Sequence, residues 1–161
     1  MAGTTPATTT NPVVKSVCGK TDAAALCESS IASLPSPPAA VDGAGVLKLA
    51  MEAVRLKVVD AINAATDRMH APGTDAASRN ALNACIESYD DIKSSIATVA
   101  DALDAGDQGT VTTNLDSLGT DVDTCNEGLK ELHVPAIMAD HNGYLAKLCS
   151  NLLAIRSVIQ H

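Results

Sequence analysis

The residues of this sequence with the clearest potential for chemistry are its five cysteines, Cys18, Cys27, Cys85, Cys125 and Cys149. No two of them form a Cys-x-x-Cys pair and the four histidines are scattered, which is not the spacing of a zinc site. Thiols in such a pattern either form disulfides or serve as small buried apolar side chains. We therefore expect no metal and no cofactor.

No common catalytic motif occurs elsewhere in the chain. Gly-x-Ser-x-Gly, a phosphate-binding loop and His-Glu-x-x-His are all missing, and Gly43-Ala44-Gly45 is too short to indicate a nucleotide site. No histidine or cationic neighbour is evident at helical spacing to activate Cys149. His141 falls on an apolar stripe, where a core or interface histidine is more common than a ligand. We expect a protein that is not an enzyme.

Glu87 and Asp91 form an acidic pair four positions apart, a spacing at which like charges mildly destabilise a helix. The pair indicates either a binding surface or a solvated acidic face. The chain carries a net charge of −8, which repels phosphate backbones and anionic membranes. We expect no nucleic-acid and no membrane partner, and a basic protein as the favoured partner.

Four amphipathic stretches must position these residues. Apolar residues recur every three or four positions in residues 47–69, 82–103, 111–132 and 137–159, the pattern of one helix face. The breaks between successive stretches are short, which favours an antiparallel up-down four-helix bundle within one chain over a dimeric coiled coil. The sequence has no Trp or Phe, so the predicted all-α fold must have an aliphatic core.

Capping residues mark the ends of these helices. Thr74-Asp75 can cap the second helix and Asp107 the third, while Pro135 suits the first turn of the fourth. Cys85 then lies near the start of the second helix and Cys125 near the end of the third. Antiparallel packing brings the two cysteines to the same height, which favours a disulfide and an oxidising compartment.

The remaining segments complete the predicted organisation of a single domain over residues 11–161. Residues 1–10 are rich in Thr and are expected to form a flexible arm, residues 11–34 a small helical hairpin, and residues 43–161 the bundle. Cys18 and Cys27 could tie the two arms of the hairpin together. Cys149 is then expected to be a buried thiol outside both bridges.

Several short segments, in order, resemble the plant invertase and pectin methylesterase inhibitor family. They are Cys18-Gly19-Lys20-Thr21 with Cys27 beyond it, Cys85-Ile86-Glu87-Ser88-Tyr89, Gly106-Asp107, and Thr124-Cys125-Asn126-Glu127. The resemblance implies a four-helix bundle with an N-terminal hairpin, disulfides Cys18–Cys27 and Cys85–Cys125, secretion to the apoplast or vacuole, and no enzymatic activity.

The resemblance also implies a binding face and a partner. The positions matching the family's contacting face are Glu87, Asp91, Thr112, Thr124 and Glu127, and the partner is an enzyme bound 1:1. Where the family often has another acid one turn after Asp91, this chain has Ser94. The hairpin could also join two protomers as a homodimer.

Two local features favour pectin methylesterase over invertase as the target. Invertase inhibitors typically carry Pro-Lys-Phe just after the Gly-Asp turn, where this chain has Gln108-Gly109-Thr110, and pectin methylesterase inhibitors resemble it in a cysteine on the last helix. The expected mechanism is non-covalent occlusion of the pectin-binding cleft in the cell wall. The alternatives are an invertase inhibitor, a structural or allergen-like helical protein, and, least favoured, a small-ligand carrier.

Overall fold

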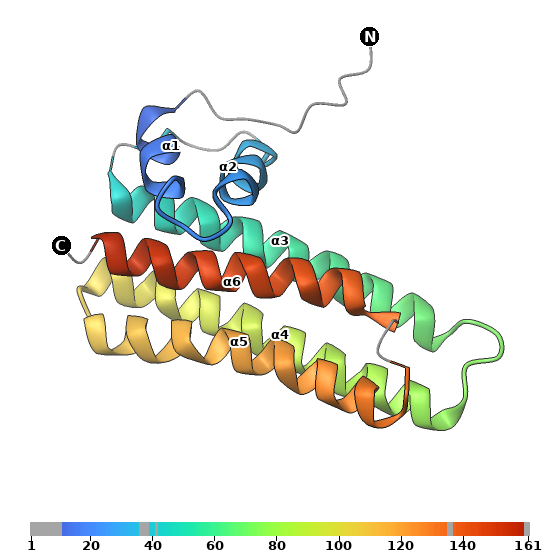
Figure 1. Ribbon diagram of the computed structural model, residues 1–161. Coiled ribbons are helices and arrows are strands. Elements are labelled where there is room, and N and C mark those ends of the chain that lie inside the picture. The colour runs from blue at the N-terminus through green and yellow to red at the C-terminus, as the bar shows by residue number, and fades with distance from the viewer. Residues whose placement is uncertain (1–10, 36–38, 41, 135–136, 160–161) are drawn as a thin grey trace, which may run out of the picture. The chain divides into compact units, whose positions relative to one another are not determined.

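A computed structural model describes residues 11–35, 39–40, 42–134 and 137–159, and every regular element within these ranges is helical (Figure 1). The flexible arm expected at residues 1–10 lies outside the described residues, as does Pro135. The helices are α1 (Pro12–Cys18), α2 (Ala24–Ala32), α3 (Gly43–Met69), α4 (Ala76–Ala105), α5 (Gln108–Glu131) and α6 (Ala139–Ile159). The predicted all-α bundle with its N-terminal hairpin is confirmed.

The chain divides into two compact units that share α3 and α6. One consists of residues up to Val54 together with those from Lys147 onward, and the other is Arg55–Ala146. The first therefore holds the hairpin, and the second holds α4, α5 and the adjoining parts of α3 and α6. None of the helices within the described ranges is both long and apolar enough to cross a bilayer.

In the first unit, a disulfide and side-chain amides fix the short hairpin. Cys18 and Cys27 are bridged, with their Cα atoms 5.5 Å apart. Asn11 caps α1 by accepting from the amides of Val13 and Val14. The Asn151 amide of α6 accepts from the Ala23 N–H at 3.2 Å and donates to its carbonyl at 3.1 Å. These contacts hold a segment too short to build a core of its own.

In the second unit, α4 and α5 form an antiparallel pair with a tight turn between them. Gly106 ends α4 with φ 73°, a left-handed conformation that glycine adopts without the clash of a Cβ. Asp107 then caps α5 by accepting from the Thr110 amide at 3.1 Å, and Asp75 caps α4 through the Ser78 amide at 2.7 Å. Both predicted caps are confirmed.

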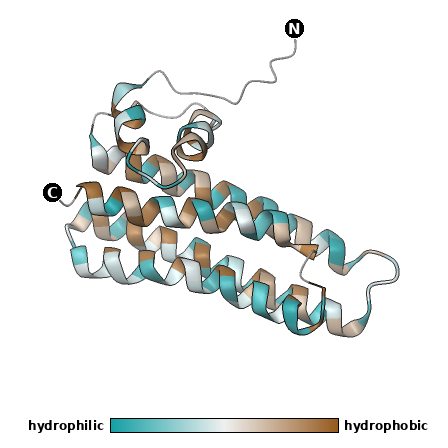
Figure 2. Ribbon diagram, in the orientation of Figure 1, coloured by the Kyte–Doolittle hydropathy of each residue, from teal (hydrophilic) through white to brown (hydrophobic). Residues whose placement is uncertain are grey.

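The core of this unit is aliphatic, and Tyr89 is its one large aromatic member among the described residues. The predicted stripes of α4 and α5 are buried along most of their length, including Leu82, Cys85 and Ile92 on α4 and Leu115 and Leu118 on α5. The prediction is wrong at Leu132, which follows the last residue of α5 and is 37% exposed. Figure 2 shows polar residues along the outward surface of α5. The amphipathic periodicity therefore determined which surface of each helix faces inward.

The inward positions of α6 differ from the prediction at its start. The sequence predicts His141 on the apolar stripe, yet His141 is only partly buried, whereas Asn142 and Met138, which precedes α6 by one residue, are each 1% exposed. An amide can occupy this inward position because its polar atoms find buried hydrogen-bond partners. Cys149, on the same helix, is buried and belongs to neither disulfide.

Candidate functional site

The second disulfide holds the candidate binding residues of α4 and α5 at one height. Cys85 and Cys125 are bonded with their Cα atoms 4.5 Å apart, and the helices run in opposite directions. Glu87 follows Cys85 by two positions and Thr124 precedes Cys125 by one, so both lie on the same side of the bridge along the helix axis. Both residues are exposed.

Asp91 extends this group by one turn on α4, and Glu127 extends it in the other direction on α5. Both are exposed. At 1.5 Å per residue, the four residues Glu87, Asp91, Thr124 and Glu127 fall within about 12 Å along the axis of the helix pair. We call these four residues, together with Asp121, the acidic face.

Asp121 is a member of this face that the sequence reasoning missed. Partial burial raises the pKa of its carboxyl group, and the nearby negative charge of Asp91 raises it further. The two carboxylates therefore repel each other across the contact between α4 and α5. Asp121 lies one turn before Cys125 and so on the same side of α5, a spacing from which it could have been found.

Thr112 does not join this group. It is exposed on α5, but lies about 18 Å along the helix from Thr124 and about a third of a turn around it. A contact from Thr112 would have to reach a different part of a partner. Its role stays a prediction.

The acidic face rests on a buried polar network around the disulfide. The Tyr89 hydroxyl donates to the Asn142 side-chain oxygen at 2.6 Å and lies 3.5 Å from the Cys125 Sγ. The Asn142 amide in turn donates to Asn126 at 2.7 Å and to the Cys125 Sγ at 3.3 Å. Burial raises the pKa of Tyr89 to about 12, so Tyr89 is neutral. The network ties α6 to the bridged pair and stiffens it.

The threonine of the face is oriented as an acceptor. The Thr124 hydroxyl donates to the Thr120 carbonyl at 2.9 Å, and this uses its only proton. Its lone pairs remain available to a partner. Together with the carboxylates of Glu87 and Asp91, they form a surface that accepts hydrogen bonds and matches a partner rich in donors.

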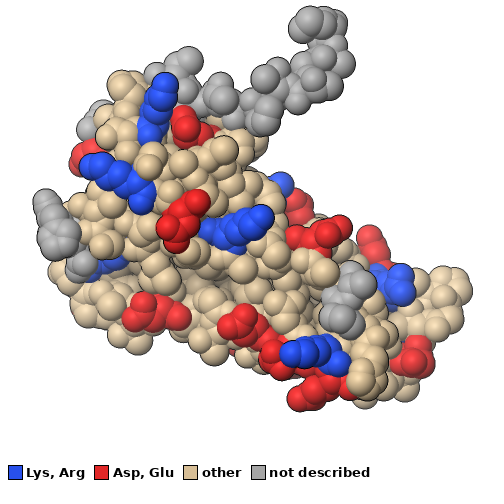
Figure 3. Space-filling view, viewed as in Figure 1, with Lys and Arg blue, Asp and Glu red and all other residues tan. Residues whose placement is uncertain are grey.

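Most of the chain's charge belongs to these two helices. α4 and α5 together hold ten acidic and three basic residues, a net of −7 out of the −8 of the whole chain. Figure 3 shows mostly acidic groups along α5, at the lower edge of the view. Such a field attracts a basic partner and repels an acidic one before contact.

The carboxylate in the turn between the two helices is hydrogen-bonded to the first turn of α5. Asp107 accepts from the Thr110 hydroxyl at 2.6 Å as well as from its amide. These hydrogen bonds, with the hydroxyl contribution the larger, lower the pKa of Asp107. Gln108 and Gly109 lie in the first turn of α5 and are exposed.

No metal-binding cluster occurs in the parts of the chain that the structure covers. There, no three His, Cys, Asp or Glu side chains cluster closely enough to hold a metal ion. What the structure establishes here is an acidic, disulfide-bridged pair of helices.

The sequence model of the family described as plant invertase/pectin methylesterase inhibitor matches residues 12–155. The chain belongs to this family. No curated protein sequence matches it at a significant level.

Solved structures show the same fold. One is a mutant form of a pectin methylesterase inhibitor from Arabidopsis, 18% identical, covering 89% of this chain and 95% of its own with a TM-score of 0.70. Another is a pectin methylesterase inhibitor from Arabidopsis thaliana, 17% identical, covering 92% and 97% with a TM-score of 0.64.

Proposed function

We propose that this protein inhibits a plant pectin methylesterase by laying the acidic face of α4 and α5 over the enzyme's pectin-binding cleft. The observation that carries the proposal is the concentration of negative charge on the two helices that the Cys85–Cys125 bridge holds together. Family membership indicates that the partner is an enzyme of this class, and the negative charge of α4 and α5 indicates that the partner's surface is positively charged.

The mechanism is occlusion and needs no covalent step. Carboxylates of Glu87, Asp91 and Glu127 pair with Lys or Arg side chains beside the cleft, and the Thr124 oxygen accepts from a neutral donor. A rigid face binds more tightly than a mobile one because less conformational freedom is lost on association. The polymer is then excluded from the occupied cleft in a 1:1 complex.

Two features favour pectin methylesterase over invertase. Gln108, Gly109 and Thr110 stand where invertase inhibitors typically carry Pro-Lys-Phe, and Cys149 on α6 is similar to a cysteine of pectin methylesterase inhibitors. An invertase of the cell wall or vacuole is the second candidate target. The proposed location is the apoplast, where an oxidising environment maintains both disulfides. A homodimer through the hairpin is the alternative to a monomer.

The test is a titration of purified plant pectin methylesterase, and separately of purified invertase, with the protein and its variants. Glu87→Gln and Asp91→Asn should weaken inhibition of the esterase, more strongly at low salt because added salt screens exposed charges. Asp101→Asn removes a charge from α4 about 24 Å from Cys85 and is the matched control.

Each outcome selects one hypothesis. Inhibition of the esterase that weakens in Glu87→Gln and Asp91→Asn but not in Asp101→Asn supports the proposed face. Equal effects of all three variants would mean that net charge, and not this face, drives binding. Inhibition of invertase alone moves the assignment to the second target, and inhibition of neither leaves a structural or allergen-like protein.

A further inference from the structure

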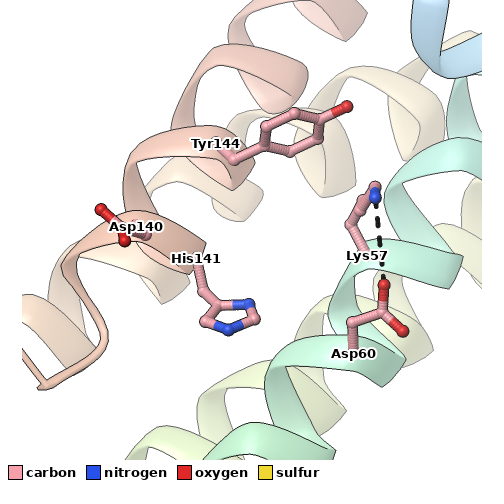
Figure 4. Close-up of a pocket in the computed structure, with 5 residues that line it drawn as sticks. All are labelled: Lys57, Asp60, Asp140, His141 and Tyr144. Carbon is pink, nitrogen blue, oxygen red and sulfur yellow. Dashed lines mark ion pairs between the residues drawn. The ribbon is translucent and has the colours of Figure 1, made fainter. Parts of the chain in front are cut away.

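The Arg55–Ala146 unit has a cleft on a surface separate from the acidic face. It lies between α3 and α6, has a volume of about 220 Å³, and is lined by Lys57, Asp60, Asp140, His141 and Tyr144 (Figure 4). The acidic face belongs to α4 and α5. The two surfaces are on different helix pairs.

The Tyr144 ring, the Lys57 ammonium and an Asp60 carboxylate form a chain of contacts in the cleft. The Lys57 ammonium lies 5.2 Å from the centre of the Tyr144 ring and 3.9 Å from an Asp60 carboxylate oxygen. His141 extends from α6 into the space toward α3 in Figure 4. Tyr144 is only partly buried, whereas Tyr89, the chain's other aromatic residue, is fully buried. Tyr144 is thus the one aromatic side chain that a ligand can reach.

The chemistry of the lining excludes several ligand classes. A metal ion is disfavoured because no cluster of three ligating side chains forms within the described ranges. A polyanion would meet two carboxylates, Asp60 and Asp140, and a cationic ligand would meet the Lys57 ammonium. A purely apolar ligand would leave these polar groups without hydrogen bonds, which is unfavourable.

A sugar ring fits the side chains that face one another in this cleft. Its C–H face can take the place of the exposed Lys57 ammonium over the Tyr144 ring, while its hydroxyls donate to Asp60 and accept from Lys57 and His141. The volume is below the range of about 300–1,000 Å³ that suits drug-sized ligands, so it matches one ring. We propose that this cleft binds a single pyranose ring.

Sugar binding in this cleft does not depend on the proposed inhibition of an esterase. Each proposal can therefore be refuted without refuting the other. The probes are D-galactose, D-galacturonate and the open-chain polyol sorbitol, titrated against the isotopically labelled full chain and followed by NMR chemical shifts. A pyranose should shift resonances of His141 and Tyr144, with a dissociation constant in the millimolar range because one ring buries few atoms. Sorbitol should not do so at the same concentration.

Variants of the ring test the assignment of Tyr144. Tyr144→Leu should weaken pyranose binding by about tenfold or more, whereas Tyr144→Phe keeps the aromatic face and should retain most of it. A preference for galacturonate over galactose that is lost in Lys57→Met assigns the ligand carboxylate to Lys57. Glu87→Gln should leave sugar binding unchanged.

Three results would overturn the proposal. They are the absence of shifts with either pyranose, equal shifts with sorbitol, and unchanged binding in a Tyr144→Leu protein whose circular dichroism matches the wild type. Asp60→Asn provides a second variant at an exposed position, which should weaken binding without affecting the fold.

Discussion

The disulfide between α4 and α5 should stabilise the protein more than the disulfide of the hairpin. The Cys85–Cys125 bridge joins positions 40 residues apart, and the Cys18–Cys27 bridge joins positions 9 apart. If each acts by restricting the unfolded chain, these loop lengths predict about 4 kcal/mol for the first and about 2.6 kcal/mol for the second. The larger value is a substantial part of the roughly 5–15 kcal/mol that stabilises a typical domain.

The assay is urea unfolding of two double variants, Cys85→Ala with Cys125→Ala and Cys18→Ala with Cys27→Ala. Tyrosine fluorescence reports only on the Arg55–Ala146 unit, because the chain has two tyrosines, Tyr89 and Tyr144, and no tryptophan. Far-UV circular dichroism reports on all helices.

We expect loss of the bundle bridge to move the tyrosine transition to much lower urea. Loss of the hairpin bridge should change the circular dichroism at low urea and leave the tyrosine transition nearly in place. Cys149→Ala measures the effect of truncating a buried cysteine without removing a bridge. If the hairpin variant lost as much stability in the tyrosine signal as the bundle variant, the chain-entropy reasoning would be wrong.

Three further predictions concern single positions of the same unit. Because the pKa of Asp121 is raised in the folded protein, ionisation of its carboxyl group lowers the free energy of unfolding. The protonated group carries no such penalty below pH 3.8, the ordinary pKa, and the penalty develops as pH rises through the raised pKa. Asp121→Asn should therefore raise the melting temperature at pH 7 and lose this advantage below pH 3.8; an equal gain at both pH values would contradict the assignment. Tyr89→Phe leaves the buried Asn142 oxygen without its donor and should lower the free energy of unfolding by about 1–3 kcal/mol in urea titrations, and no change would mean that water replaces the hydroxyl. Gly106→Ala forces alanine to a positive φ and should destabilise by about 1–2 kcal/mol, whereas Gly119→Ala, inside α5 with open space around it, should stabilise by up to about 1 kcal/mol in thermal unfolding; effects of the same sign would refute this contrast.

The helices and their ends could be predicted from the sequence because the responsible interactions are local. The three-to-four residue periodicity that produces the buried stripes of α4 and α5 extends over single helices, and so do the caps of Asp75 and Asp107. Predicting the Cys85–Cys125 disulfide required one further inference, the relative direction of two consecutive helices. Two consecutive helices with a tight turn must run antiparallel, which sets the height of each residue against its neighbour.

The lateral relations between helices depended on the tertiary structure. Asn142 looks like a polar surface residue in sequence, and the hydrogen bonds that make an inward amide favourable come from Tyr89, Asn126 and Cys125 on other helices. The spacing of Asp121 from Cys125 places it on the same side of α5, but its partial burial and its nearness to Asp91 depend on α4 as well. Lys57 and Tyr144 are far apart in the chain and meet only through the packing of α3 on α6. The sequence by itself thus determined the helices, the caps of α4 and α5 and the Cys85–Cys125 pairing, since these depend on neighbours along the chain. The fold alone decided which polar groups share an environment, because hydrogen bonds, burial and charge depend on neighbours in space.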